Sequence, residues 1–438
     1  MLRNTFVATV FAICAALALV IVMAPRSSAQ TATVLYTFTG GTDGGGDQGT
    51  LVFDIAGNLY GTTSSGGKGA GVVFKLSPGA SGWTETVLYS FTGSRDGGKP
   101  QSGLVLDAAG NLYGTAQYGG DTSSTACAPR GCGVVFELSP GIGGPWTETV
   151  LHTFHKGTTG GYPSSPLIFD AAGNLYGTTF AGGDTSKCAQ IGCGVVYELS
   201  LIQGAWRVAV LHTFTGGADG DGPLSGVIFD AAGNLYSETY QGGVLNCSNG
   251  SDNGCGAILR LSPSSPGPWK ASILHTFGGG RDGGNPRGGL AIDGSGNIYG
   301  TTVYYGGNTG CGGVGCGVVF ELSPVTGGWK ASLLHTFAGG AADGGNPSST
   351  LLLDSSGNLY GTTWDGGSSL CGDGCGTAYR LSPSTGAWIE TILHAFDSLD
   401  GQNLLAGLIL DAHGSLYGAT YAGGTGQNVF GTVFKITP

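Results

Sequence analysis

Gly57-Asn58-Leu59-Tyr60-Gly61-Thr62-Thr63 is the stretch that decides the fold, because close copies of it return six more times. The copies are centred on Tyr113, Tyr176, Tyr236, Tyr299, Tyr360 and Tyr417, at intervals of 53 to 63 residues. Self-similarity at a nearly fixed period is the mark of a repeat architecture, in which each unit buries apolar surface against its neighbours. We therefore expect residues 30–438 to form one domain of seven units.

Each unit contains four segments with the composition of short β-strands. In the third unit they are Pro166 to Asp170, Leu175 to Thr179, Gly194 to Ser200 and Trp206 to Phe214. The tight turn Ala171-Ala172-Gly173-Asn174 joins the first two segments, which is a hairpin signal. Glycine makes up 88 of the 438 residues, yet 40% of the chain is apolar, so the glycines indicate turns between strands and not disorder. We expect an all-β protein.

Four short antiparallel strands repeated seven times are typical of a seven-bladed β-propeller. The two ends of the chain favour a closed ring. The last unit stops after its third strand, Gly431 to Ile436, whereas residues 33–38 match the fourth strand of the other units. The N-terminal strand can therefore complete the seventh blade and cover two sheet edges that would otherwise be exposed. The alternative, an open β-solenoid, gives no reason to divide one unit between the termini.

Two repeated polar positions are expected to serve folding. The Asp that ends the first strand should cap the turn after it, and it occurs as Asp54, Asp107, Asp170, Asp230, Asp293, Asp354 and Asp411. His or Tyr fills one position of the fourth strand, as Tyr36, Tyr89, His152, His212, His275, His335 and His394. This strand should be the outermost, about three strand spacings of ~4.8 Å from the innermost one. The five histidines therefore cannot converge on one metal ion, and we assign them to packing.

Ten of the eleven cysteines form close pairs in the loops between the second and third strands. The pairs are Cys127 with Cys132, Cys188 with Cys193, Cys247 with Cys255, Cys311 with Cys316, and Cys371 with Cys375. In an exported chain such pairs indicate disulfides, whereas the alternative, a metal site, needs tetrahedral clusters with further His or Cys. These loops and the loops that join the units should emerge at one end of the ring, which we call the top face. Variable loops suit recognition, so we expect function there.

Residues 1–29 have the pattern of an export signal: Arg3, the apolar run Thr5 to Ala24, and the small residues Ser27-Ser28-Ala29. The alternative is an uncleaved membrane anchor. The net charge of −11 disfavours nucleic acid and anionic lipid. We expect a secreted, periplasmic or cell-surface monomer that leaves the membrane once the signal is cleaved.

The repeated motifs also carry a family resemblance. Gly-Asn-Leu-Tyr-Gly-Thr-Thr, the following Gly-Val-Val-Phe-Glu-Leu-Ser-Pro strand and the Leu-His-Thr-Phe strand resemble the GloVer tandem-repeat proteins of bacterial surfaces and secretomes. The first hairpin is also similar to those of NHL-type propellers. The resemblance covers about residues 33–438 and implies an exported repeat protein. It implies no defined biochemical activity.

Binding residues are expected where the copies disagree. On the top face six such residues come from the fifth and sixth units: Arg281, Arg287, Tyr304, Tyr305, Trp364 and Asp365. Aromatic rings beside Arg and carboxylate groups can stack on and hydrogen-bond a sugar or an extended peptide. The alternative is ordinary loop variation.

Cofactor and catalytic signals are sparse. Asp219-Gly220-Asp221-Gly222 could offer calcium ligands, but we favour an Asp-Gly turn because the alternating ligand pattern of a calcium loop is missing. Glu238 replaces a Thr of the repeat and could form an acid–base pair with His155 or His413. The sequence contains no nucleophile elbow, phosphate loop or dinucleotide fingerprint, so we expect no cofactor.

The favoured hypothesis is a non-catalytic exported scaffold that binds a glycan or a protein through its disulfide-bonded loops. The rival is a propeller enzyme, a lyase or a glycoside hydrolase, with acidic groups at the mouth of the channel.

Overall fold

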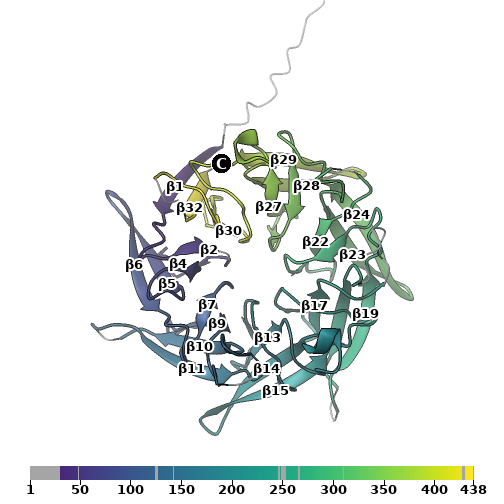
Figure 1. Cartoon of the computed structure of the whole chain (residues 1–438). Helices are drawn as coiled ribbons and strands as arrows, with labels where there is room; N and C mark the ends of the chain where they lie inside the picture. The colour runs from purple at the N-terminus through teal and green to yellow at the C-terminus, as the bar shows by residue number, and fades with distance from the viewer. Residues whose placement is uncertain are drawn as a thin grey trace, which may run out of the picture.

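The computed structural model describes residues 30–47, 49–123, 127–141, 143–244, 247, 253–264, 267–308, 310–426 and 430–437. Seven antiparallel sheets surround a central channel (Figure 1). The regular elements are strands apart from two short 3-10 turns, η1 (Cys188–Gln190) and η2 (Ser369–Cys371). The all-β, seven-bladed propeller is thereby confirmed. The expected export signal lies outside the described residues, and no helix within them is long and apolar enough to cross a membrane.

The strands of each blade follow one another from the channel outward. Blade 1 contains β2 (Gly45–Asp47), β3 (Val52–Phe53), β4 (Leu59–Ser65), β5 (Val72–Gly79) and β6 (Gly82–Ser90). Blade 2 contains β7 (Gly98–Pro100), β8 (Val105–Leu106), β9 (Leu112–Tyr118), β10 (Val134–Ser139) and β11 (Thr147–Thr153). Blade 3 contains β12 (Ile168–Phe169), β13 (Leu175–Thr179), β14 (Val195–Ile202) and β15 (Ala205–Thr213). Blade 4 contains β16 (Ile228–Phe229), β17 (Leu235–Thr239), β18 (Ala257–Ser262) and β19 (Lys270–Thr276).

The remaining blades repeat this order. Blade 5 contains β20 (Gly284–Pro286), β21 (Ala291–Ile292), β22 (Ile298–Tyr304), β23 (Val318–Val325) and β24 (Gly328–Thr336). Blade 6 contains β25 (Gly344–Pro347), β26 (Leu352–Leu353), β27 (Leu359–Gly366), β28 (Thr377–Ser384) and β29 (Ala387–Ala395). Blade 7 contains β30 (Ile409–Leu410), β31 (Leu416–Ala419), β32 (Thr432–Thr437) and β1 (Thr31–Thr37).

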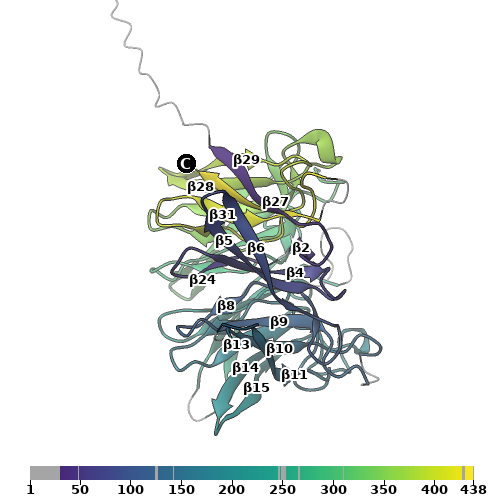
Figure 2. The ribbon, with the colours of Figure 1, turned by 90° about the vertical axis from the view of Figure 1, so that its left-hand side faces the viewer.

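The N-terminal strand closes the ring as expected. β1 pairs with β32 in antiparallel register, from Thr31 opposite Thr437 to Thr37 opposite Thr432. Figure 2 shows this purple strand beside the yellow strands of the last blade. The two ends of the chain therefore share one sheet.

The innermost strand is shorter than the sequence indicates. In blades 1, 2, 5 and 6 it is divided into two short pieces that both pair with the second strand. In blade 2 these pieces are β7 and β8, and the chain leaves the sheet between them. The first piece ends at Pro100, and proline has no N–H to donate to a ladder. The residues after it, Gln101 to Gly103, line the channel.

The turn between the first two strands is capped by aspartate, as predicted. In blade 1, Oδ1 of Asp54 accepts hydrogen bonds from the backbone N–H groups of Ala56 and Asn58, each at 2.9 Å. Its Oδ2 accepts from Nδ2 of Asn58 at 2.7 Å and from the hydroxyl of Tyr60 at 3.0 Å. The Asn and the Tyr therefore recur in the repeat because their side chains hydrogen-bond the Asp that caps this turn.

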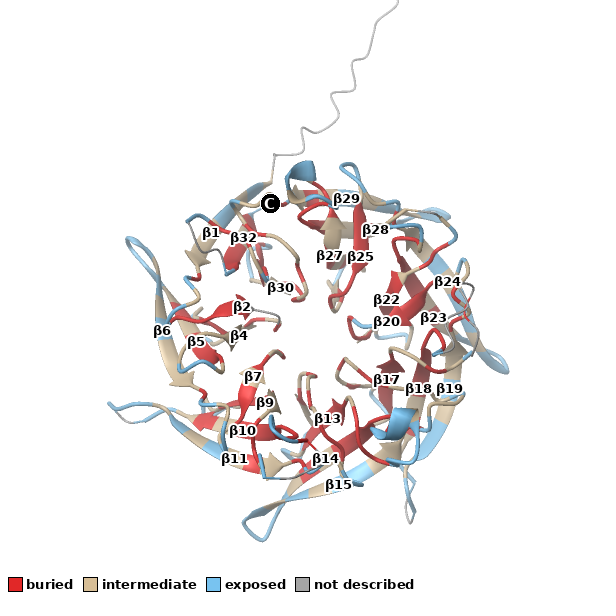
Figure 3. Ribbon diagram, viewed as in Figure 1, coloured by how far each residue is buried: buried red, intermediate tan, exposed pale blue. Residues whose placement is uncertain are grey.

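The core lies between neighbouring blades. A phenylalanine that follows each outer strand is at most 1% exposed, and these residues are Phe38, Phe91, Phe154, Phe214, Phe277, Phe337 and Phe396. Phe38 packs edge-on against Phe74 of the next blade with ring centroids 5.1 Å apart, and Phe91 packs in the same way against Phe136. Figure 3 shows the buried strands between the channel and the exposed outer loops.

Candidate functional site

A pocket of about 420 Å³ lies on the top face beside the channel, and we call it the mouth pocket. Blades 5, 6 and 7 supply its lining, which consists of Arg287, Val303, Tyr304, Asn346, Ser348, Trp364, Asp365, Leu405 and Tyr421. Four of the six residues singled out in the sequence are among them. The fold therefore brings Arg287, Tyr304, Trp364 and Asp365 together.

Aromatic side chains reach the pocket because the second strand of each blade ends at the top face. Trp364 stands four residues after the repeated Tyr360, and Tyr421 stands four residues after Tyr417. Their ring centroids are 6.1 Å apart and their planes are inclined by 35°. Two neighbouring blades thus present a pair of partly exposed rings to one cavity.

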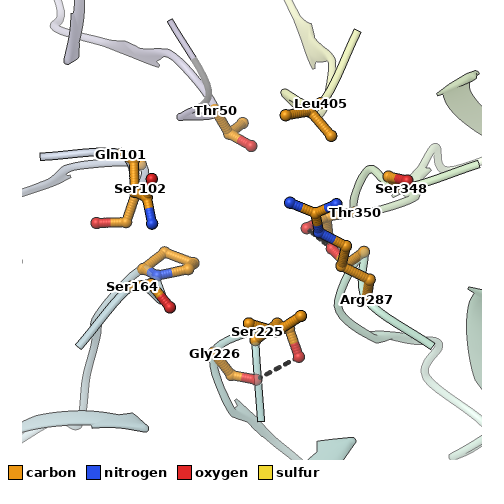
Figure 4. A pocket seen from close by; sticks show the side chains of 14 residues that line it. Thr50, Gln101, Ser102, Ser164, Ser225, Gly226, Arg287, Ser348, Thr350 and Leu405 are labelled. Carbon is orange, nitrogen blue, oxygen red and sulfur yellow. Dashed lines mark hydrogen bonds between the residues drawn. The ribbon is translucent and has the colours of Figure 1, made fainter. Parts of the chain in front are cut away.

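The mouth pocket continues into the channel, because Arg287, Ser348 and Leu405 line both cavities. Figure 4 shows the guanidinium of Arg287 projecting into the channel. The hydroxyl and amide groups around it belong to Thr50, Gln101, Ser102, Ser164, Ser225, Ser348 and Thr350. Arg287 is the one charged side chain among the described residues that line the channel. It places a fixed positive charge at the edge of a neutral polar ring.

One acidic side chain of the mouth pocket, and a tyrosine that is hydrogen-bonded to Tyr304 behind it, complete its electrostatics. Burial, together with the charge of Asp373, raises the pKa of Asp365 to about 6. The side chains of Tyr240 and Tyr304 are hydrogen-bonded, and burial raises the pKa of Tyr240 to about 12 although the charge of Arg287 opposes this. Tyr240 therefore remains protonated at neutral pH.

Two of the six predicted residues lie outside the mouth pocket. Tyr305 is 7% exposed, and its ring packs in the core between blades 4 and 5 with Cys255. It follows Tyr304, the last residue of β22, and its own φ of 70° lies in the left-handed region, so the chain leaves the strand direction at this residue. Arg281 is exposed beside His275 and Leu333 in a groove between the outer strands. The structure therefore does not bring these two residues together with the other four, and their binding role stays a prediction.

The two calcium candidates have other contacts. Oδ2 of Asp219 lies 3.1 Å from Nε2 of His212 and accepts a hydrogen bond of 3.1 Å from the backbone N–H of Thr215. Its Oδ1 accepts a hydrogen bond from the Thr215 hydroxyl. Asp221 forms a backbone bridge with Gln241, and burial raises the pKa of its carboxyl to about 6. These contacts are those of a capped Asp-Gly turn.

Glu238 does not meet either of its proposed histidine partners. Its Oε1 accepts a hydrogen bond of 2.7 Å from the N–H of Gly289, and burial raises its pKa to about 7. His155 pairs with Asp121 in a top-face loop at 3.5 Å. His413 lies in the bottom turn of blade 7, where its N–H donates to Asp411. Glu238 is fully buried behind the channel wall, so the three groups occupy different regions.

The five predicted disulfides are confirmed, and each one borders a hydrogen bond between blades. The carbonyl oxygen of the second Cys accepts from a backbone N–H of the loop that leads into the next blade. The donors to Cys132, Cys193, Cys255, Cys316 and Cys375 are Tyr162, Gly222, Asn285, Asn346 and Asn403, at 2.7 to 3.0 Å. Five disulfides indicate an oxidising environment.

Sequence reasoning missed Val303, Asn346, Ser348, Leu405 and Tyr421 among the residues that line the mouth pocket. For Val303 and Tyr421 the missed signal is a column of the repeat, four residues after the repeated Tyr, that holds Ser64, Gln117, Phe180, Tyr240, Val303, Trp364 and Tyr421. Four of these seven residues are aromatic, and all stand where the second strand reaches the top face. Trp364 is therefore one member of an aromatic-rich column and not an isolated exception.

Three solved structures of similar shape are distant in sequence. A Trichoderma reesei carbohydrate-active enzyme of family AA12 is 12% identical, with 94% of this chain and 96% of that chain covered and a TM-score of 0.42. A Dyadobacter fermentans protein of unknown function is 12% identical, with coverage of 93% and 98% and a TM-score of 0.44. The polysaccharide lyase Uly1 is 10% identical, with coverage of 90% and 89% and a TM-score of 0.49.

No curated protein sequence matches this chain. A family model does match, and it is described as the Gloeobacter/Verrucomicrobia repeat. The match covers residues 20–128 and 244–438, which is more than half of the sequence. The chain therefore belongs to the Gloeobacter/Verrucomicrobia repeat family.

Proposed function

We propose that this protein is an exported, non-catalytic carbohydrate-binding propeller that holds a sugar in the mouth pocket. The observation that carries the proposal is the pair of inclined rings, Trp364 and Tyr421, beside Arg287 and Asp365. Aromatic faces pack against the C–H faces of sugar rings, while charged and amide groups hydrogen-bond their hydroxyls. The pocket volume of about 420 Å³ falls in the usual range of about 300–1,000 Å³ for small-molecule sites.

The number of carboxyl groups at the mouth pocket and the channel favours sugar binding over glycoside hydrolysis. A hydrolase of the usual type needs two carboxyl groups about 5–10 Å apart. Among the described residues that line the mouth pocket and the channel, Asp365 is the one carboxylic acid. Arg287 adds a positive charge that favours sugars bearing a carboxylate or a sulfate group.

The proposed location is outside the cytoplasm, as a secreted, periplasmic or cell-surface monomer. The apolar segment within residues 1–29 would direct export. The five disulfides, which need an oxidising compartment, support this assignment.

A glycan array tests the proposal with wild type, Trp364→Ala, Tyr421→Ala and the matched control Arg281→Ala. Arg281 is an exposed top-face residue outside the mouth pocket. We expect the two aromatic variants to bind the recognised glycan at least about tenfold more weakly, the loss expected when a central contact residue is truncated. Arg281→Ala should bind like wild type.

Two results would contradict the proposal. Identical profiles for wild type and Trp364→Ala would remove the mouth pocket as the binding site. Release of shortened or unsaturated sugar products by wild type, abolished in Asp365→Asn, would favour the enzyme instead.

A further inference from the structure

The outer rim of the propeller contains seven equivalent junctions between neighbouring blades. Each junction combines the His or Tyr of one outer strand, a residue of the loop that follows it, and one residue of the next outer strand, which in blades 1 to 6 stands two positions after the repeated Trp. At the junction of blades 7 and 1 these are Tyr36, Asp43 and Glu85, and the Tyr hydroxyl donates to Asp43 at 3.0 Å. At the junction of blades 4 and 5 they are His275, Asp282 and Ala331.

When the three positions are compared by sequence at all seven junctions, only the junction of blades 5 and 6 has His, Asp and Glu together. His335 lies at the end of β24, Asp343 precedes β25, and Glu390 lies in β29. Nε2 of His335 is 3.4 Å from Oδ1 of Asp343 and 3.7 Å from Oε2 of Glu390. These three atoms all lie within 4.8 Å of one another.

The imidazole alone cannot satisfy both carboxylates. Nε2 carries at most one proton and can donate to only one of the two oxygens that face it. The other oxygen of Glu390, Oε1, is buried and has no hydrogen-bond partner among the described residues. The carboxyl groups of Glu390 and Asp343 also share a hydrogen bond, so a proton holds them together at a place that a cation could take.

The three side chains are held in place by their surroundings. The backbone N–H groups of Ala338 and Gly344 each donate to the Asp343 carboxylate at 2.7 Å. The His335 ring packs edge-on against Phe337 with centroids 4.6 Å apart. The side chains of His335, Asp343 and Glu390 are 20%, 15% and 14% exposed, so an ion can reach them from solvent. The cluster is ordered before any ligand arrives.

We propose that His335, Asp343 and Glu390 form a binding site for a divalent cation of the zinc class. For metal–ligand bonds of about 2.0–2.2 Å, the ligand atoms of a tetrahedral site are about 3.3–3.6 Å apart, close to the two separations measured from Nε2. Imidazole nitrogen with carboxylate oxygen suits zinc and its transition-metal neighbours better than calcium or magnesium. The fourth position would be taken by water.

The bound ion would join three segments from two blades. β25, which begins directly after Asp343, contains Asn346, a residue of the mouth pocket. The ion would therefore stabilise the blade-joining loop that leads to this wall of the pocket. The proposal does not depend on carbohydrate binding, because its readout is metal affinity.

The other junctions supply variants that the fold already accommodates. His335→Tyr recreates the Tyr-Asp-Glu junction of blades 7 and 1, and Glu390→Ala recreates the His-Asp-Ala junction of blades 4 and 5. The matched control is His394→Tyr, which changes the equivalent histidine of a junction without a Glu, where Asp400 is the acidic partner. Unchanged metal-free melting temperatures would show that all three variants fold.

The experiment is a zinc chloride titration of the EDTA-treated protein, followed by calorimetry and thermal unfolding. We expect wild type and His394→Tyr to bind one ion and to melt at higher temperature with zinc. His335→Tyr and Glu390→Ala should bind at least about tenfold more weakly and lose the thermal shift. The absence of saturable binding to wild type, or full binding by His335→Tyr, would overturn the proposal.

Discussion

At the scale of single residues, the aspartate at the end of each first strand contributes to stability through its ionised form. In blade 2, Asp107 accepts hydrogen bonds from Asn111 and Tyr113. Burial opposes its ionisation, but these hydrogen bonds outweigh that effect and lower the pKa of Asp107. A lowered pKa means that the folded chain keeps the charge to lower pH than the unfolded chain does. The contribution is therefore complete above about pH 4 and is lost as the pH falls further.

Asp107→Ala should lower the free energy of unfolding by about 1–3 kcal/mol at pH 7, because two backbone N–H groups and a tyrosine hydroxyl lose a charged acceptor. Urea unfolding at pH 7 and pH 3 measures this change, and the difference from wild type should shrink at pH 3. Tyr113→Phe, which removes one of the hydrogen bonds, should have a smaller effect. An equal difference at both pH values would show that the charge is unimportant.

His152 should make the stability of the fold depend on pH in a higher range than Asp107 does. Its Nε2 is buried with no hydrogen-bond partner among the described residues, and the loop position that elsewhere supplies Asp holds Thr159. Burial, with the charge of His155, lowers the pKa of His152 to about 4, from the usual 6.5. Between these values the unfolded chain binds a proton that the folded chain does not. Stability should therefore be complete above about pH 6.5 and fall toward pH 4, by at most about 1.4 kcal/mol per pH unit.

His152→Phe should reduce this loss of stability between pH 7 and pH 5, as measured by thermal unfolding. Thr159→Asp should reduce it too, because the added carboxylate gives the imidazole the partner present at the junctions of His212, His275, His335 and His394. If both variants keep the wild-type pH profile, another group is responsible for it.

At the scale of elements, each disulfide orders the strand-joining segment that contacts the next blade. In blade 3 the disulfide joins Cys188 and Cys193, and the carbonyl of Cys193 accepts from the N–H of Gly222 at 3.0 Å. Replacing both cysteines by Ser should cost about 2 kcal/mol, the chain-entropy value for so small a loop. We also expect faster hydrogen exchange at Gly222, because its acceptor is less ordered.

Blade 1 provides the control for this prediction. The N–H of Lys99 donates to the carbonyl of Ala70 at 2.8 Å, in a junction without a disulfide. Hydrogen exchange at Lys99 should be the same in wild type and in the double Ser variant. Unchanged exchange at Gly222 would show that the disulfide and the blade contact are independent.

The second, third and fourth strands could be predicted from sequence because their hydrophobic alternation and turns are local properties. The first strand could not be predicted in full. Its break after residues such as Pro100 depends on the space available at the channel, where seven blades converge. In blades 2, 5 and 6 the sequence signal for this break is the proline that ends the first piece and has no N–H for a ladder hydrogen bond, whereas in blade 1 the piece ends at Asp47.

At the scale of the whole molecule, the position of each residue within its repeat predicted only part of the mouth pocket. Register placed Trp364 and Arg287 at the top face, but their shared cavity depends on how blades 5, 6 and 7 lie around the channel. Tyr421 was missed because it is 57 residues from Trp364 and meets it only across a blade boundary. Tyr305 packs in the core and not in the mouth pocket, because residues adjacent in sequence need not face the same side of the strand end.

Closure of the ring by the first strand predicts the effect of removing it. β1 covers the outer edge of β32, and Phe38, which follows β1, is buried against Phe74 of blade 1. A chain that begins at residue 40 should lose at least the roughly 3–5 kcal/mol associated with removing one buried Phe side chain. It should also self-associate through the exposed strand edge. Thermal unfolding and light scattering measure both effects, and a synthetic peptide of residues 30–39 should reverse them. A chain that begins at residue 30 is the control. If the shorter chain remains monomeric with an unchanged melting temperature, β1 does not hold the ring closed.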